Sequence, residues 1–278
     1  MHSRDLVFPG GKIKAVTLSY DDGVIYDKTL CEIMARYGVK GTFNINSGWF
    51  SADEKRMSEQ DAFKLYDKYD MEVAIHGEDH KMYHKIASSN VMLDIIKDRV
   101  FLEKKTGRII KGMAYPYGRF TADVKEIARL AGVKYARTTN STHAFDLPTD
   151  WLELNPTCHH NDKKLSELTD LFLSKTKPQK YQPAAMFYLW GHAYEFNNDD
   201  NWDIIETFCK KMSAQKEDIW FATNGEIYDY CLAYSRLEFS ADESFVYNPT
   251  LTDVSFRDYV LSPEKIYTVK SGETLALK

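Results

Sequence analysis

At 278 residues, the chain has room for one large domain and a small addition, and its 44% hydrophobic content can fill a sizeable core. A net charge of −5 gives no positive potential that would attract nucleic acid. The sequence contains no run of about 18 apolar residues of the kind that predicts a membrane span. No secretory signal is visible at Met1–Asp5, so we expect a cytoplasmic protein, while its oligomeric state stays open. Four cysteines without CxxC spacing predict free thiols rather than a disulfide framework.

Apolar, β-prone runs alternate with segments of helical period, which is the pattern of βαβ units in a parallel sheet or barrel. The expected strands are 15–19, 42–46, 72–75, 109–114, 134–137, 151–154, 185–190 and 219–222. The expected helices are 26–37, 58–69, 90–105, 121–131, 165–175, 202–216 and 226–236. Ser58 and Thr121 are predicted N-caps, and Gly38 and Gly132 follow predicted helix ends. We therefore expect an α/β barrel over residues 1–236.

The helical period disappears after about residue 236. Short strands are expected at 245–247, 254–256 and 266–269, with a turn at Ser271-Gly272. We predict that residues 237–278 form a small β-rich appendage packed on the barrel.

The stretch Ser19-Tyr20-Asp21-Asp22-Gly23 follows the apolar run that ends at Leu18. Two adjacent carboxylates thus lie where a buried strand should end, which is the usual position of a catalytic site in an α/β barrel. Neighbouring side chains of an extended chain point to different sides, so one carboxylate can bind a cation while the other faces substrate. A polar turn that caps the next helix would have the same sequence.

His76-Gly77-Glu78-Asp79-His80 begins where the strand 72–75 should stop. Two histidines four residues apart converge if the segment turns helically, and Gly77 permits a sharp exit from the strand. Two histidines and one carboxylate can hold a metal ion with an open coordination position, and Asp22 is the candidate third ligand. The alternative is a polar helix face, because His84 continues the same spacing.

Two later strand ends carry further candidates. Tyr115-Pro116-Tyr117-Gly118 closes one apolar run with a rigid turn that can aim a backbone N–H into a site. His192 follows the apolar strand 185–190. Either feature alone is compatible with a structural role, but a barrel brings all of these strand ends to one face.

With these residues assembled, the chain resembles the polysaccharide deacetylase family, carbohydrate esterase family 4. The Thr-Phe-Asp-Asp-Gly motif of that family is similar to residues 19–23, and its His-Ser/Thr-x-x-His motif is similar to 76–80. Its proline-tyrosine-glycine turn matches 116–118, and its late strand-end histidine matches His192. The match spans roughly residues 13 to 225, with the motifs in the family's order.

The resemblance implies a distorted (β/α) barrel of seven or eight strands and a divalent metal ion, commonly zinc, that helps water to remove an acetyl group. The roles that it implies are Asp21 as general base, Asp22, His76 and His80 as metal ligands, Tyr117 as backbone oxyanion donor, and His192 as general acid.

Several positions depart from the family's motifs. Ala114 stands where an arginine usually orients the base, and Arg137, at the end of the next expected strand, is a candidate replacement; a surface position for Arg137 is the alternative. Trp190 replaces part of a leucine-containing motif, so it is expected to shape the pocket for the acetyl methyl group. The family's acid-tryptophan motif has only a poor match, at Asp150-Trp151.

The leading functional hypothesis is a metal-dependent hydrolase that removes an acetyl group from an N-acetylated sugar or oligosaccharide. Two alternatives remain: an amidohydrolase that acts on a small non-sugar amide, and a carbohydrate-binding protein with a vestigial site. Metal content and turnover separate the enzymes from the binding protein, and a substrate panel separates the two enzymes.

Overall fold

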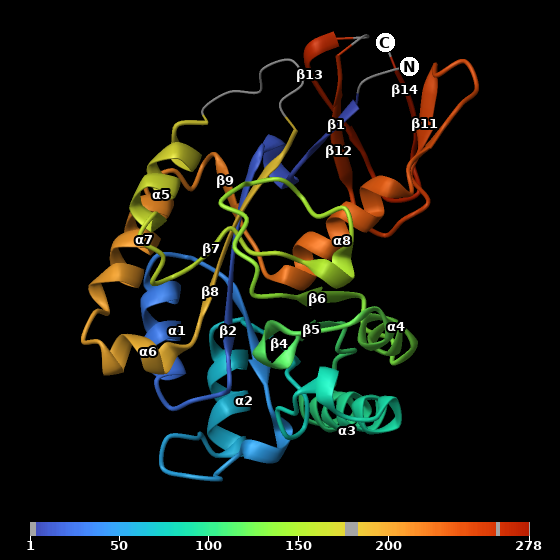
Figure 1. The fold of residues 1–278 in the computed structure, drawn as a ribbon. Coiled ribbons are helices and arrows are strands. Elements are labelled where there is room, and N and C mark those ends of the chain that lie inside the picture. The colour runs from blue at the N-terminus through green and yellow to red at the C-terminus, as the bar shows by residue number, and fades with distance from the viewer. Residues whose placement is uncertain (1–3, 176–182, 260–261, 278) are drawn as a thin grey trace.

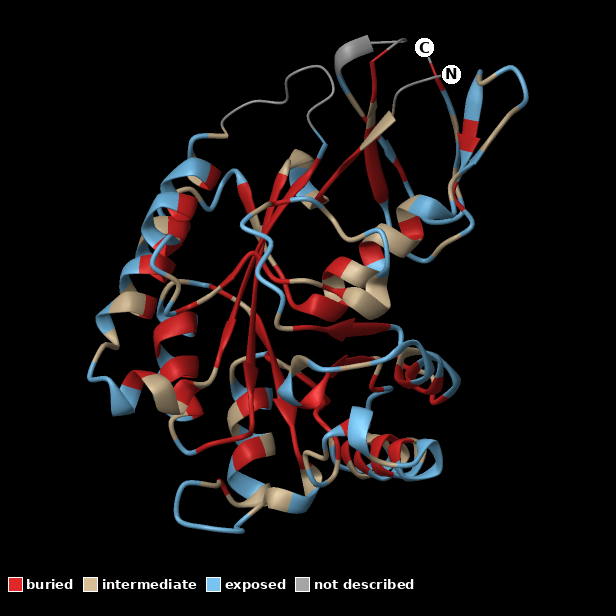
Figure 2. Ribbon diagram, viewed as in Figure 1, coloured by how far each residue is buried: buried red, intermediate tan, exposed pale blue. Residues whose placement is uncertain are grey.

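The computed structural model describes residues 4–175, 183–259 and 262–277 (Figure 1). Its main sheet consists of strands β2 (Lys14–Asp21), β3 (Gly41–Ile45), β4 (Glu72–Ile75), β5 (Gly112–Ala114), β6 (Tyr135–Arg137), β7 (Cys158–His159), β8 (Ala185–Gly191) and β9 (Ile219–Phe221). All residues of β2, β3, β5 and β8 are buried, as expected for parallel strands that are covered on both faces (Figure 2). These strands occupy the centre of the molecule.

The strands of this sheet are all parallel and curl into a distorted barrel. Their order is β6-β5-β4-β3-β2-β8-β7, and β9 pairs with the first half of β2. Beyond β6, Leu154 forms a parallel bridge to Arg137, and β7 follows a few residues later against β8. The segment from Leu154 to His159 therefore connects the two ends of the sheet. The predicted fold class, a distorted (β/α) barrel of seven or eight strands, is confirmed.

Helices surround the sheet (Figure 1). They are α1 (Asp27–Arg36), α2 (Glu59–Lys68), α3 (Ser88–Thr106), α4 (Ala122–Leu130), α5 (Leu165–Leu173), α6 (Ala193–Asn198), α7 (Asp203–Ser213) and α8 (Asn224–Ser235). Short 3-10 turns are η1 (Pro9–Gly11), η2 (Ser47–Trp49), η3 (Tyr83–Lys85), η4 (Pro116–Gly118) and η5 (Trp151–Glu153). Ser58 and Thr121 cap α2 and α4 through side-chain oxygens, as predicted. None of the helices in the described ranges is long and apolar enough to cross a membrane.

Two small antiparallel sheets lie beside the barrel. One joins β1 (Arg4–Val7), β12 (Val254–Asp258) and β13 (Ser262–Val269), and the other joins β10 (Glu238–Phe239), β11 (Phe245–Tyr247) and β14 (Thr274–Ala276). The strands predicted in the C-terminal segment are thus present, and the N-terminal strand β1 pairs with them, which the sequence did not indicate. The division into a barrel of 1–236 and an appendage of 237–278 stays a prediction.

Two local predictions were incomplete. Residues 151–154 were expected to form a strand, but Trp151–Glu153 is a 3-10 turn, and only Leu154 pairs with the sheet. The side chain of Asp150 accepts a hydrogen bond from Leu152 N (2.8 Å) and so caps this turn. The short helix α6, directly after β8, was not predicted.

Candidate active site

The two neighbouring carboxylates at the end of β2 face different surroundings. Asp21 is the last residue of β2, and its Oδ1 accepts a hydrogen bond from Asn44 Nδ2 (2.8 Å). Asp22 has a backbone φ of 83°, a left-handed conformation that aspartate tolerates better than most residues. Its Oδ1 is buried without a hydrogen-bond partner and lies 3.8 Å from His76 Nε2. The structure thus separates the two carboxylates, as the sequence predicted.

Arg137 reaches Asp21 across the barrel. Its Nη2 forms a short ion pair with Asp21 Oδ2, and both side chains are at most 3% exposed. The guanidinium also lies over the ring of Trp190, 4.4 Å from its centroid. Burial disfavours the charged form of Asp21, but Arg137, nearby histidines and the hydrogen bond from Asn44 outweigh it and lower its pKa to about 2. Arg137 is therefore a buried partner of Asp21 and not a surface arginine.

His76 and His80 converge with Asp22 at the end of β4. Their Nε2 atoms are 3.1 Å apart, and His80 Nε2 lies 4.0 Å from Asp22 Oδ1. The spacing predicted this meeting, but the expected helical turn is wrong, since the segment is an irregular loop. Gly77 and His80 have φ values of 80° and 52°, and these left-handed residues turn the chain back.

The chemistry of these three side chains fits a divalent metal ion. His76 Nδ1 lies 2.9 Å from the carbonyl oxygen of Ala114, which can only accept, so the ring proton is on Nδ1 and the lone pair of Nε2 faces the cluster. Burial and the neighbouring His76 lower the pKa of His80 to about 3, which keeps that imidazole neutral. Neutral imidazoles and an unpartnered carboxylate oxygen are the donors that zinc requires.

A second group of possible metal ligands differs in its protonation. Glu195 Oε2 lies 3.1 Å from Nε2 of both His159 and His160. However, the backbone N–H of Asn161 donates to His159 Nδ1 (3.1 Å), so the lone pair is on Nδ1 and the proton of neutral His159 is on Nε2. Neutral His159 therefore donates to Glu195, and its Nε2 offers no lone pair to a metal ion.

His192, directly after β8, lies between Asp21 and Glu195. Its Nε2 lies 3.9 Å from Asp21 Oδ2, and its Nδ1 lies 3.4 Å from Glu195 Oε1. The backbone N–H of His192 also donates to Glu195 Oε2 (3.1 Å). Burial disfavours the charged form of His192, but Glu195 together with Asp21 and Asp22 outweighs it and raises the pKa. His192 is thus biased toward its protonated form beside Asp21.

The two remaining predicted site residues lie at the edges of this arrangement. Tyr117, in the turn η4, has a φ of 59°, and its ring packs 4.4 Å from the ring of His80. Trp190 packs edge-on against His159 (4.6 Å) and near His192 (5.9 Å). All of the predicted site residues therefore lie at one end of the barrel, where the strands β2, β4, β5, β6 and β8 terminate.

The family model for polysaccharide deacetylases matches residues 10–136. This match confirms the resemblance of these residues to the polysaccharide deacetylase family. No curated protein sequence matches the chain.

Solved structures of deacetylases share the fold. A variant of the peptidoglycan deacetylase PdaC from Bacillus subtilis is 13% identical, with 80% of this chain and 93% of that chain covered and a TM-score of 0.53. A family 4 carbohydrate esterase from Streptomyces lividans is 14% identical (74% and 90% covered, TM-score 0.50). A pseudoenzyme of that family from Bacillus anthracis is 17% identical (77% and 65% covered, TM-score 0.52). In three of the structural matches, this chain spans 61 to 67% of the length of the matched chain.

Sequence reasoning on the deacetylase motifs missed some residues of the site. Glu195 is not among the predicted site residues, although it follows His192 by three residues in the next helix. Trp49 and Arg56, from the loop after β3, contact the metal-ligand group and carry no motif that would reveal them. Asp150, the candidate for the acid of the fourth deacetylase motif, instead pairs with Lys125 at 2.8 Å.

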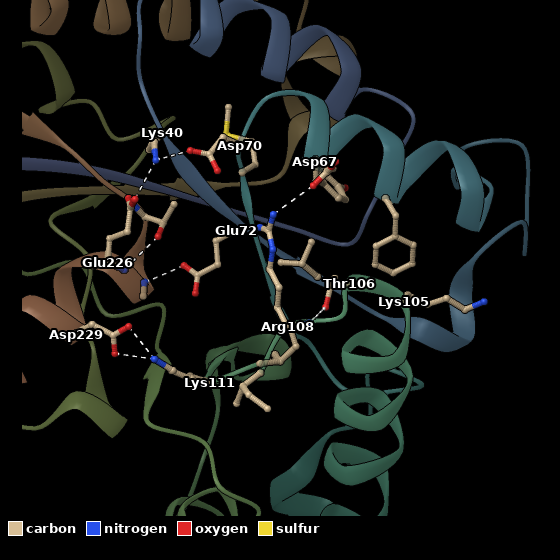
Figure 3. Close-up of a pocket in the computed structure, with 18 of the residues that line it drawn as sticks. Lys40, Asp67, Asp70, Glu72, Lys105, Thr106, Arg108, Lys111, Glu226 and Asp229 are labelled. Atoms are coloured by element: carbon tan, nitrogen blue, oxygen red, sulfur yellow. Dashed lines mark hydrogen bonds and ion pairs between the residues drawn. The ribbon is translucent and has the colours of Figure 1, made fainter. Parts of the chain in front are cut away.

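The opposite end of the barrel carries a separate pocket of about 550 Å³ (Figure 3). It lies where strands begin, because Glu72 is the first residue of β4 and Lys111 precedes β5. Its charged side chains bind one another: Lys40 contacts Asp70 (2.6 Å) and Glu226 (2.9 Å), and Lys111 contacts Asp229 (2.7 Å). Catalytic groups of barrel enzymes gather at the other end, so Asp21 and its neighbours are the candidate active site.

Proposed function

We propose that the protein is a metal-dependent deacetylase that hydrolyses the acetyl group of an N-acetylated sugar or oligosaccharide. The observation that carries the proposal is the convergence of Asp22, His76 and His80, with His76 fixed in the ligand tautomer, next to the buried Asp21–Arg137 pair. The match of residues 10–136 to the deacetylase family model supports the same reaction class.

In this proposal, Asp22, His76 and His80 hold the divalent metal, for which zinc is the first candidate. When bound, such an ion polarises the acetyl carbonyl and acidifies water. Asp21 accepts the proton of the attacking water, and Arg137 fixes the orientation of that carboxylate. The low pKa of Asp21 keeps it ionised over the working range of pH.

The leaving amine needs a proton, and His192 is placed to supply it. Water adds its oxygen to the acetyl carbon, the C–N bond breaks, and the amine nitrogen takes the proton from His192, which yields acetate and a free amino group. Tyr117 is proposed to donate its backbone N–H to the developing oxyanion, and Trp190 to pack against the acetyl methyl group. The half-exposed ring of Tyr194, 5.0 Å from His192, can stack on a sugar face.

The reaction is tested by measuring acetate release from a panel of N-acetylated mono- and oligosaccharides, before and after chelation and after addition of zinc. We expect release that disappears on chelation and returns with one equivalent of zinc, because Asp22, His76 and His80 are close enough together to bind a single ion. Two bound equivalents would contradict our assignment of the second cluster. A protein that binds metal but releases no acetate would favour an amidohydrolase that acts on a small non-sugar amide. A protein that neither binds metal nor releases acetate would favour a carbohydrate-binding protein with a vestigial site. Cell fractionation would test the cytoplasmic location.

Glu195 provides a test of the general acid. Glu195→Gln removes the anion that contributes most to raising the pKa of His192, so the protonated form is lost at lower pH than in the wild type. The basic limb of the kcat profile should therefore move to lower pH, with the largest loss of activity at alkaline pH and little change near pH 5. Glu206→Gln, which alters an exposed ion pair with Arg36, is the control. An unshifted basic limb in Glu195→Gln would show that this carboxylate does not act on the general acid.

A further inference from the structure

We infer that the loop after β3, residues 46–57, is a bracket that positions the metal ligands although it provides none of them, and that Arg56 and Trp49 are its main contacts. This inference rests on the proposed metal site. The loop leaves β3 between β2 and β4, the two strands whose ends carry Asp22 and His76. It is therefore placed to contact both ligand-bearing segments.

On the β2 side, Arg56 holds the backbone of Asp22. Its Nη1 donates a hydrogen bond to the carbonyl oxygen of Asp22 (2.6 Å), and its side chain is only 16% exposed. Val24 and Arg56 form an antiparallel bridge, and Ile25 N donates to Lys55 O (2.9 Å). Asp22 has a φ of 83°, so a contact that fixes its carbonyl also fixes the left-handed conformation that aims its carboxylate.

On the β4 side, Trp49 packs against the other left-handed ligand. Its ring lies 5.1 Å from the ring of His80, and the guanidinium of Arg56 stacks on its face at 4.2 Å. Arg56 and Trp49 thus form a continuous row of contacts between Asp22 and His80, two ligands from different strands. Asp22 contacts Arg56, His80 contacts Trp49, and the two side chains contact each other.

The start of the loop is hydrogen-bonded to the backbone of the segment that leaves β4. Asn46 Nδ2 donates to the carbonyl oxygens of both His76 and Gly77 (2.8 Å each), and Gly48 N donates to Glu78 O (2.9 Å). A Cβ at Gly48 would lie 2.6 Å from that carbonyl oxygen, so only glycine allows this approach. These contacts align the bracket with His76 before it reaches Trp49.

The charge of Arg56 and its proposed positioning role predict opposite changes in metal affinity when Arg56 is lost. A guanidinium beside a dication repels it, so charge alone predicts that loss of Arg56 strengthens metal binding. A positioning role predicts weaker binding, because the ligands lose their alignment. Variants that preserve charge separate the two effects: Arg56→Lys keeps the cation but cannot stack as a planar group, and Trp49→Ala removes no charge.

The test measures zinc affinity of the metal-free protein by competition with a chromophoric chelator, which does not depend on activity. We expect Trp49→Ala and Arg56→Lys each to weaken zinc binding about 10-fold, which is the range for residues that orient metal ligands. In the double variant, the fold-loss of zinc affinity should be smaller than the product of the losses in the two single variants, since the two side chains contact each other and act together. Lys55→Ala, at an exposed position of the same loop, should stay within about twofold of the wild type.

The possible outcomes distinguish failure of the bracket proposal from failure of the proposed metal site. Wild-type zinc affinity in both Trp49→Ala and Arg56→Lys would overturn the bracket, and unchanged affinity with a raised KM would assign Trp49 to substrate instead. If the wild type binds zinc no better than His76→Ala, the metal site fails and the bracket fails with it. Trp49→Leu, which keeps an apolar side chain without an aromatic ring, replaces Trp49→Ala with the same expected loss if the alanine variant does not fold.

Discussion

Arg137→Ala should lose both stability and turnover, because it leaves Asp21 charged, buried and without its cation. Removing one partner of a buried ion pair costs about 3 to 5 kcal/mol, which for a chain of this size corresponds to a fall in melting temperature of roughly 10 °C. The orientation of Asp21 is lost as well, so kcat should fall by about 100-fold even in protein that remains folded. Calorimetry and acetate release below the lowered melting temperature measure the two effects separately.

An exposed pair of the same residue types provides the matched control. Arg108 and Asp67 are 3.2 Å apart with side chains that are 60% and 78% exposed, and they lie at the opposite end of the barrel. Surface pairs contribute about 0 to 1 kcal/mol, so Arg108→Ala should change the melting temperature little and leave turnover intact. Arg137→Lys keeps the charge and should fall between the wild type and Arg137→Ala. Full turnover in Arg137→Ala would refute its role as the partner of the base.

The barrel was predictable because its elements carry strong local patterns. The strand predicted at 72–75 has those bounds in the structure, since a buried parallel strand appears as a short apolar run that ends at glycine or polar residues. The apolar run at 151–154 has a similar pattern, but Trp151 packs edge-on against Tyr228 (5.2 Å) and the segment forms a turn. Periodicity cannot distinguish these cases, because the turn is capped by the side chain of Asp150 and carries a ring contact to a residue distant in the sequence.

The site was predictable to the extent that it follows strand ends. Asp22, His76 and His80 were grouped correctly because a barrel brings these ends together, although the backbone that joins the histidines was predicted with the wrong geometry. The approach of Arg137 to Asp21 was anticipated from its position at the end of β6. Trp49 and Arg56 were not found, because contacts made by an irregular loop depend on its path and leave no periodic signal.

Exchanging each neighbouring carboxylate for its amide should separate the two functions at the end of β2. Asp22→Asn is expected to weaken zinc binding by more than about 100-fold, because it removes an anionic ligand. Loss of a residue that only orients a ligand typically weakens metal binding by about 10- to 100-fold. Asp21→Asn should keep zinc affinity within about tenfold but lower kcat by about 10² to 10⁴, the usual contribution of a positioned general base. Chelator competition and acetate release on the same preparations give both quantities.

The two amides also differ in their expected effect on folding. Asp21→Asn leaves Arg137 buried without an anion, so metal-free Asp21→Asn should melt well below the wild type. The cationic partner of Asp22 is more distant, because Arg56 Nη1 lies 3.8 Å from its carboxylate and hydrogen-bonds to its backbone. Metal-free Asp22→Asn should therefore melt near the wild type but gain little stability from added zinc, because ligand binding stabilises only the form that binds. Loss of zinc in Asp21→Asn with retention in Asp22→Asn would reverse the assignment of base and ligand.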